Sequence, residues 1–236
     1  MPEYGHHSGP EADPGARAIS LIYAIGDIHG SLDKLRKLIV RCEEHADGRP
    51  MTFVFLGDYI DRGPDSFGVI GTMMDLQSRH NNLIALKGNH EALAVDIFDG
   101  REDPAHWLTQ GGAETLQSYG VTNARELPQV HIEWLRSLPL RYDDGSRFFV
   151  HAGINPDKAL DAQSEHDLLW IREPFLFDER DYGRLIVHGH TPRSTGAPDL
   201  RGNRLNLDTG AVFGGPLTAA AFAGAHPNPL AFLQAE

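Results

Sequence analysis

The chain has 236 residues and a formal net charge of −12, from 21 Lys and Arg against 33 Asp and Glu. This length fits one ordinary domain with a substantial core, and 41% hydrophobic residues with 23% charged ones argue against global disorder. No apolar run approaches about 18 residues, and the N-terminus lacks a signal-peptide pattern, so we expect no membrane span. The acidic balance argues against binding to nucleic acid or to anionic membranes.

The single cysteine, Cys42, excludes an internal disulfide and any zinc site built on cysteines. Together with the missing targeting signals, it leads us to expect a cytoplasmic protein. Residues 1–18 are rich in Gly, Pro, His and small polar residues. We therefore predict a disordered tail there, followed by one domain over residues 19–236.

From residue 19 onward, the chain repeats strand, loop and helix three times. Apolar runs predict buried strands over Ile19–Ile25, Met51–Leu56 and Asn82–Leu86. Apolar residues at helical spacing follow each strand, the third set from Glu91 onward. This pattern is typical of an α/β sheet covered by helices.

The middle of the chain, residues 104–138, is predicted as a helical insertion with glycine interruptions. Strand patterns return at 138–142, 147–150, 185–187, 204–207, 217–222 and 230–233. Because the strands near the C-terminus are short and separated by Gly and Pro, we expect an antiparallel second sheet. The whole predicts an α/β fold (α+β layered) of two packed, mixed β-sheets flanked by helices, as a single domain.

Every strong polar cluster follows a predicted strand. In α/β sheets, ligands bind outside the carboxyl ends of the strands, and flanking glycines let side chains converge. We therefore expect five loops to meet at one site. They are Gly26-Asp27-Ile28-His29-Gly30, Gly57-Asp58-Tyr59-Ile60-Asp61-Arg62-Gly63, Gly88-Asn89-His90-Glu91, His151-Ala152-Gly153 and His188-Gly189-His190-Thr191.

The residue types in these loops suit two divalent metal ions. Carboxylate, imidazole and amide oxygen bind Mn, Fe, Zn or Mg, whereas the absence of thiolate argues against a structural zinc. Two such ions carry more charge than two carboxylates neutralise, so the site attracts phosphate and lowers the pKa of bound water. A metal-bound hydroxide can attack phosphorus in line, without a covalent enzyme intermediate.

In this order, the motifs Gly-Asp-x-His-Gly, Gly-Asp-x-x-Asp-Arg-Gly, Gly-Asn-His-Glu, His-Ala-Gly and Gly-His-Thr resemble the calcineurin-like metallophosphoesterases. More closely, they resemble the compact bacterial serine/threonine protein phosphatases of the phosphoprotein phosphatase type. The resemblance runs from about Tyr23 to Leu217. It implies a metallophosphoesterase-like β-sandwich and a dinuclear metal centre, with manganese as the expected metal and iron, zinc or magnesium as alternatives.

The resemblance also implies six metal ligands. We expect His188 to be structural or to support a ligand from behind, and Glu91 to lie near the dipole at the start of its helix. The ligands would be Asp27 and His29 for the first metal, Asn89, His151 and His190 for the second, and Asp58 for both.

The same resemblance assigns the catalytic and substrate-binding groups. His90 would protonate the leaving alkoxide, oriented by Asp61, because a protonated His beside a carboxylate can hold a proton near neutral pH. Arg62 would hold phosphate oxygens through its planar fork, and Asn89 would also face the substrate. The second phosphate-binding arginine would be Arg172, which follows a tryptophan as in the family.

Several residues are expected to play supporting parts. Asp208 would support the site from behind its ligands, and Gly111 and Gly112 would mark a loop at the pocket rim. Core positions are expected for the three tryptophans, Trp107, Trp134 and Trp170.

The expected activity is that of a metal-dependent serine/threonine protein phosphatase, which hydrolyses phosphomonoesters and takes a phosphoprotein or another phosphorylated substrate. The alternative is symmetrical hydrolysis of diadenosine tetraphosphate, although hydrolases of that kind tend to carry Ala at the position of Asp61. A catalytically silent metal-binding module is a remote alternative, because such a protein should have lost a ligand or the His–Asp pair. The sequence sets neither the oligomeric state nor the native metal pair.

Overall fold

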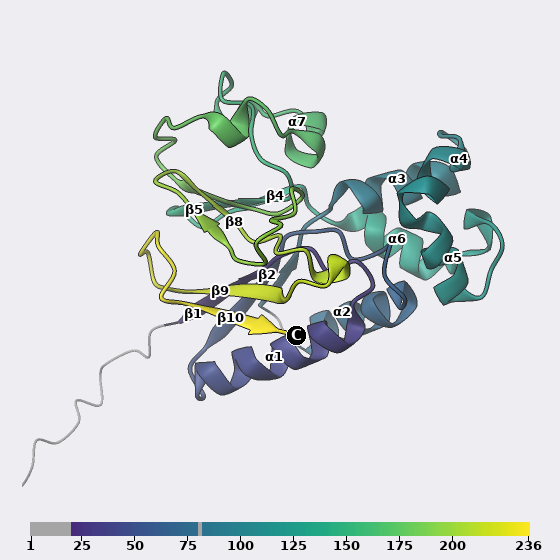
Figure 1. Cartoon of the computed structure of the whole chain (residues 1–236), viewed down its shortest axis with the longest axis horizontal. Coiled ribbons are helices and arrows are strands. Elements are labelled where there is room, and N and C mark those ends of the chain that lie inside the picture. Colours follow the sequence, from purple (N-terminus) through teal and green to yellow (C-terminus); the bar gives the residue numbers. More distant parts are fainter. Residues whose placement is uncertain (1–19, 80–81) are drawn as a thin grey trace, which may run out of the picture.

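The computed structural model describes residues 20–79 and 82–236. The tail predicted over residues 1–18, and the first residue of the strand predicted from Ile19, lie outside these described ranges. Two five-stranded sheets pack face to face, with helices on their outer faces and at one end (Figure 1). The predicted fold of two packed mixed sheets flanked by helices is confirmed.

The first sheet has the strand order β10-β9-β1-β2-β3. Its three parallel strands are β1 (Leu21–Ile25), β2 (Met51–Phe55) and β3 (Leu83–Ala85). Two antiparallel strands complete it, β9 (Leu217–Ala223) beside β1 and β10 (Ala231–Ala235) at the edge. The connections between the parallel strands are α1 (Leu32–Ala46) and α2 (Ser66–Arg79), which cover the outer face (Figure 1).

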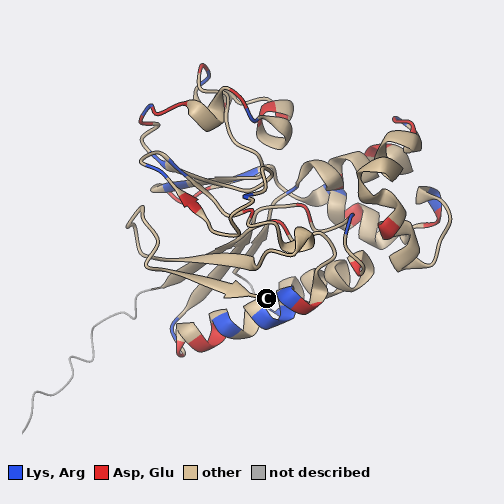
Figure 2. Ribbon diagram, in the orientation of Figure 1, with Lys and Arg blue, Asp and Glu red and all other residues tan. Residues whose placement is uncertain are grey.

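Helix α1 shows why the sequence covers the sheet in this way. Its buried residues recur every three or four positions and pack against the sheet, whereas Lys, Arg, Asp and Glu occupy the outward face (Figure 2). Cys42 lies on the buried face, and burial raises the pKa of its thiol to about 12. The thiol is therefore protonated at neutral pH and shielded from reagents.

The second sheet has the order β4-β5-β6-β8-β7. Its strands are β4 (Arg141–Asp143), β5 (Arg147–Val150), β6 (Leu185–His188), β7 (Asp199–Leu200) and β8 (Arg204–Asn206). The central three run parallel, and only the edge strands are antiparallel. The expected antiparallel second sheet is thus wrong. The last two strands do pair antiparallel, but they belong to the first sheet.

Strand β9 explains this difference, because it is buried on both faces. Ala219 and Ala221 face the helix-covered core, and Ala220 and Phe222 face the second sheet. A strand of small apolar residues reveals its type through its pattern, but its pairing partner depends on the tertiary packing. The core between the sheets consists of Ala24, Val54, Leu56, Leu86, Phe149, Leu185, Val187, Leu205, Leu207, Ala220 and Phe222.

Helices at one end of the sheets form a separate layer (Figure 1). They are α3 (Asn89–Phe98), α4 (Pro104–Trp107), α5 (Ala113–Tyr119) and α6 (Gln129–Ser137), with a π-helical turn over Leu108–Gly112 and a 3-10 turn over Ala124–Glu126. We call residues 104–138 the helical insertion. Helix α7 (Glu165–Trp170) packs on the outer face of the second sheet. Within the described ranges, no helix combines the length and apolarity needed to cross a membrane.

Candidate active site

The five predicted loops converge at the carboxyl ends of strands from both sheets. The backbone N–H of His190, after β6, donates to the Asp27 carboxylate after β1, and His151 Nε2 lies 2.8 Å from Asn89 Oδ1. All six expected metal ligands are at most 7% exposed. Burying polar groups costs free energy unless they have partners, so a folded core does not gather six of them without reason. Their convergence therefore indicates a binding site.

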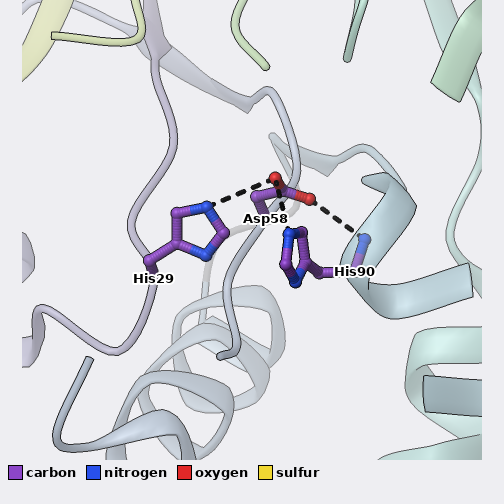
Figure 3. A group of neighbouring side chains, drawn as sticks. All are labelled: His29, Asp58 and His90. Atoms are coloured by element: carbon purple, nitrogen blue, oxygen red, sulfur yellow. Dashed lines mark hydrogen bonds and ion pairs between the residues drawn. The ribbon is translucent and has the colours of Figure 1, made fainter. Parts of the chain in front are cut away.

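Asp58 lies at the centre of this site, with imidazoles on either side. Its Oδ2 is 3.4 Å from His29 Nε2 and 4.0 Å from His90 Nε2 (Figure 3), whereas its Oδ1 is 3.4 Å from His151 Nε2. Burial alone would raise the pKa of Asp58, but His151, His90 and His29 outweigh it and hold that pKa well below its usual range. The carboxylate is therefore ionised, with one oxygen toward each group of rings.

On one side of Asp58, three atoms that could bind a metal lie close to one another. His190 Nδ1 lies 3.0 Å from Asn89 Oδ1 and 3.2 Å from His151 Nε2. His151 Nδ1 donates to Leu56 O at 2.9 Å, which leaves the lone pair on Nε2, as second-shell bonds do for metal-bound histidines. Burial lowers the pKa of both rings, that of His190 to about 2, and so favours the neutral form that binds metals.

On the other side of Asp58, His29 is held in the same way. Its Nδ1 donates to Ile60 O at 2.7 Å, which turns Nε2 toward Asp58, and Nε2 also lies 2.6 Å from Arg62 Nη1. Burial lowers the pKa of His29, but contact with the Asp58 carboxylate outweighs burial and leaves the pKa raised. Among the described residues, the two compact groups that could hold a metal are His29, Asp58 and His90, and Asp58, His151 and His190.

Asp27 lies beside these groups rather than within either of them. Burial raises the pKa of Asp27 well above its usual range, and the charges of Asp208 and Asp58 add to this effect. Bound divalent cations would relieve the repulsion among these carboxylates. The donor set therefore fits a dinuclear divalent metal site, whose metal the ligand types leave open. Gly189 allows the approach, since a Cβ there would lie 2.0 Å from Asp27 Oδ1.

The backbone of the site is strained. Five of its residues other than glycine have a left-handed φ: His29 (45°), Asp58 (55°), Asp61 (72°), Arg62 (66°) and His190 (64°). Each such residue costs roughly 1 kcal/mol, and clusters of them occur where surrounding contacts enforce a functional geometry. The sequence motifs give no direct sign of this strain.

Hydrogen bonds to Glu91 stabilise this strained backbone. Fully buried in the first turn of α3, its carboxylate accepts the backbone N–H groups of Asp58, Tyr59 and Gly88, each at 2.8 Å. Burial raises the pKa of Glu91 to about 8, with the charge of Asp58 adding to it and the N–H donors opposing it. The predicted role near the helix dipole is thus incomplete, because Glu91 fixes the loop that carries Asp58.

The predicted proton-donating pair is in contact. His90 Nδ1 lies 2.6 Å from Asp61 Oδ2, and both side chains are buried. Because Nδ1–H donates to Asp61, the other ring nitrogen, Nε2, is left on the side of Asp58. A buried imidazole with one nitrogen anchored and the other facing a polar centre is well placed to pass a proton.

The two expected phosphate-binding arginines have different surroundings. The Arg62 guanidinium lies beside His29 and 5.8 Å from the ring centroid of Phe213. Arg172 is exposed, and its charge contributes to the lowered pKa of His190. The Trp170 ring before it lies 6.4 Å from the His190 ring and is 37% exposed, so its predicted core position is wrong. Helix α7 ends at this residue, which leaves the ring at the edge of the site.

His188 does not contact the ligand atoms directly. Its Nδ1 donates to Gly189 O at 3.0 Å, its ring packs edge-on against Phe175, and burial lowers its pKa to about 3. It is a neutral, buried ring that supports the turn before His190, in keeping with a structural role.

A phosphate ester is the group that this arrangement suits, because its negative oxygens can lie between bound cations and guanidinium groups. Fold and site together define a metal-dependent phosphoesterase. The chain belongs to the calcineurin-like phosphoesterase family, whose model matches residues 20–224. The predicted resemblance is confirmed.

Two curated relatives that cover most of the chain carry names with different substrates. A bis(5'-nucleosyl)-tetraphosphatase PrpE (asymmetrical) from Anoxybacillus flavithermus is 32% identical, covering 83% of this chain and 87% of that protein. Serine/threonine-protein phosphatase 1 of Salmonella typhimurium is also 32% identical, covering 84% and 90%. A solved Saccharomyces cerevisiae protein serine/threonine phosphatase, similar to human phosphatase PP5, has a TM-score of 0.65 at 18% identity, covering 94% of this chain and 81% of that one. This last likeness shows the fold.

Proposed function

We propose that this phosphoesterase hydrolyses phosphomonoesters, with phosphoserine and phosphothreonine in proteins as its preferred substrates. The contact between His90 and Asp61, next to Asp58, carries this proposal. A serine or threonine leaves as a strongly basic alkoxide that needs a proton, whereas the polyphosphate leaving group of a dinucleotide is a weak base. A buried pair kept for proton donation is therefore most useful with an alkoxide.

The proposed mechanism assigns two divalent ions, with manganese as our choice, to the six expected ligands Asp27, His29, Asp58, Asn89, His151 and His190. When bound, they would supply positive charge to the phosphate and lower the pKa of water. Arg62 and Arg172 bind the remaining phosphate oxygens and hold phosphorus in line, with Asn89 beside them. His90 donates the proton from Nε2 to the leaving oxygen while Asp61 holds the ring in place.

The relatives named as bis(5'-nucleosyl)-tetraphosphatases support a second candidate, hydrolysis of diadenosine tetraphosphate. The alternative expected from the sequence is symmetrical cleavage, whereas the Anoxybacillus flavithermus relative is named for asymmetrical cleavage. Parallel measurements of kcat/KM on a phosphothreonine peptide and on diadenosine tetraphosphate, with manganese-loaded protein, discriminate the two. We expect the peptide to be preferred, and a dominant rate on the dinucleotide would overturn the proposal. Phosphotyrosine peptide and mononucleotides complete the panel.

A catalytically silent module would cleave none of these substrates, so failure of the manganese-loaded protein on p-nitrophenyl phosphate would favour that alternative. A phosphoprotein partner and a cytoplasmic location stay predictions from the sequence. Fractionation of cells that express the tagged chain tests the location.

A further inference from the structure

The carboxylate of Asp61 is held by more than its catalytic partner. Its Oδ2 accepts the indole N–H of Trp107 at 2.8 Å in addition to His90 Nδ1 at 2.6 Å, and its Oδ1 accepts the Thr115 hydroxyl at 2.7 Å. Asp61 and Trp107 are completely buried, and Thr115 is 1% exposed. Three donors on a buried carboxylate satisfy it and fix its orientation.

The helical insertion also fixes the backbone beneath this carboxylate. The N–H of Asp61 donates to Thr115 Oγ1 at 2.9 Å and to Ser66 Oγ at 3.1 Å, and the N–H of Arg62 donates to Gly111 O at 3.1 Å. Asp61 and Arg62 are two of the left-handed residues, which cost free energy unless neighbouring contacts enforce them. The insertion therefore makes contacts that stabilise the strained loop.

Two glycines in the π-helical turn allow this approach. A Cβ at Gly112 would lie 2.3 Å from Trp107 Cδ2, and one at Gly111 would lie 2.4 Å from the backbone nitrogen of Arg62. Gly111 also has a φ of 110°, a conformation that other residues rarely adopt. The chain kinks at Gly111, between α4 and α5, and this kink brings the Trp107 indole and the loop with Asp61 together. From the sequence, we expect these glycines in a loop at the pocket rim. In the structure, Gly111 also contacts the loop that carries Asp61 and Arg62.

We propose that Trp107, assisted by Thr115, is a positioning residue for proton donation. Its indole N–H holds Asp61 Oδ2 so that His90 Nδ1 finds its acceptor in one orientation and His90 Nε2 stays aimed at the leaving oxygen. The side-chain hydrogen bonds of Trp107 and Thr115 run to Asp61 and Ser66, which are not expected metal ligands. The inference rests on the proposed function only for the role of His90 as the proton donor.

The test compares substrates that differ in their need for a proton. A phosphothreonine peptide loses an alkoxide, whereas p-nitrophenyl phosphate loses a much weaker base that leaves without protonation. Trp107→Phe should lower kcat on the peptide by about 10- to 100-fold, because hydrogen bonds to charged groups are worth roughly that factor. The fall on p-nitrophenyl phosphate should be less than about threefold.

Trp134→Phe is the matched control. Trp134 lies in the same insertion but donates its indole N–H to Gln77, at 2.7 Å, instead of Asp61. Phe keeps a ring beside Tyr59, which Trp134 contacts at 5.7 Å between ring centroids, so both rates should stay near those of the wild type. Where Trp107→Phe folds poorly, as judged by its thermal midpoint, Thr115→Val removes one donor with little change in shape. Thr115→Ser keeps the hydroxyl and should restore the peptide rate.

The outcomes separate this inference from the proposed function. Equal losses on both substrates in folded Trp107→Phe and Thr115→Val would overturn positioning, because a purely structural role lowers both rates together. If His90→Asn itself shows no difference between the substrates, the proposed proton donor is wrong. If His90→Asn shows the difference and neither Trp107→Phe nor Thr115→Val does, only the present inference fails.

Discussion

The two halves of the site, on either side of Asp58, are built differently. The half toward the second sheet holds two neutral imidazoles and an amide oxygen, positioned by strand and helix ends, with His151 anchored by a backbone carbonyl. The half toward the helical insertion contains His29, the His90–Asp61 pair and Arg62, and three of these four residues have a left-handed φ.

This difference indicates a division of labour. Neutral nitrogen and amide ligands suit the retention of a cation and offer no group that exchanges protons near neutral pH. The other half combines charged groups with a backbone held in a costly conformation by contacts from the insertion. We expect changes in the first half to affect metal content, and changes around His90 to affect turnover.

The largest effect is expected where the halves meet. Asp58→Asn removes the negative charge that faces both groups of imidazoles, so the protein should lose both metal ions on dialysis. Turnover should fall by about 10³-fold or more, because bound metals supply several kcal/mol of transition-state stabilisation. Elemental analysis checks the first result. Retention of both ions would show that Asp58 is not the bridging ligand.

The next prediction separates the halves. His90→Asn should lower turnover on a phosphopeptide by about 10² to 10⁴-fold, the usual contribution of a general acid, and leave the metal content unchanged. His151→Asn is its counterpart, and it should lower the metal content instead. Metal loss in His90→Asn, with retention in His151→Asn, would reverse the division that we draw.

A smaller effect is expected at Glu91, which supports the Asp58 loop without lying among the ligands. Above its raised pKa of about 8, the Glu91 carboxylate accepts three backbone N–H groups, whereas in Glu91→Gln an amide NH₂ faces one of them. At about pH 9 the free energy of unfolding should therefore fall by about 1–3 kcal/mol. Urea unfolding measures it. Glu165→Gln is the control, because Glu165 is an exposed residue in the first turn of α7 and should change stability by less than about 1 kcal/mol. Equal effects would reduce Glu91 to a helix-dipole residue.

The smallest effect concerns the support of α7, which carries Trp170 toward His190, in the half of the site that faces the second sheet. Bonds from Lys158 and Ser164 outweigh burial and lower the pKa of Asp167 to about 2, so the folded state favours its ionised form. This stabilisation is complete above about pH 4 and is lost as pH falls from there toward 2. Asp167→Asn should remove that part of the acid dependence. If the free energy of unfolding of Asp167→Asn changed with pH below about pH 4 as steeply as that of the wild type, this prediction would be wrong.

Much of the fold could be predicted because its strands and helices follow simple periodicity. The strands expected at 147–150 and 185–187 appear as β5 and β6, and the helix expected after the first strand appears as α1. The short strand β7 and the helix α7 were not predicted, since two and six residues carry too little periodic pattern. The sheet to which β9 belongs could not be inferred either, because both of its faces are apolar.

The residues of the site could be predicted from the sequence, but the hydrogen bonds that hold them in place could not. Loops at strand ends identified the charged and imidazole groups, which the structure brings together around Asp58. The supports were not visible, because Glu91 and Trp107 act over long sequence separations through bonds to backbone or carboxylate. A tryptophan in a helix is typical of a core, and only its indole N–H, aimed at Asp61, distinguishes it.

The bonds from Glu91 to the Asp58 loop, and from His29 and His151 to backbone carbonyls, are made entirely by protein atoms. We therefore expect these bonds to keep the ligands in place without bound ions, so that little ordering entropy opposes metal uptake. A chelator should then strip the ions while leaving the circular dichroism spectrum intact, and added manganese should restore turnover without a refolding lag.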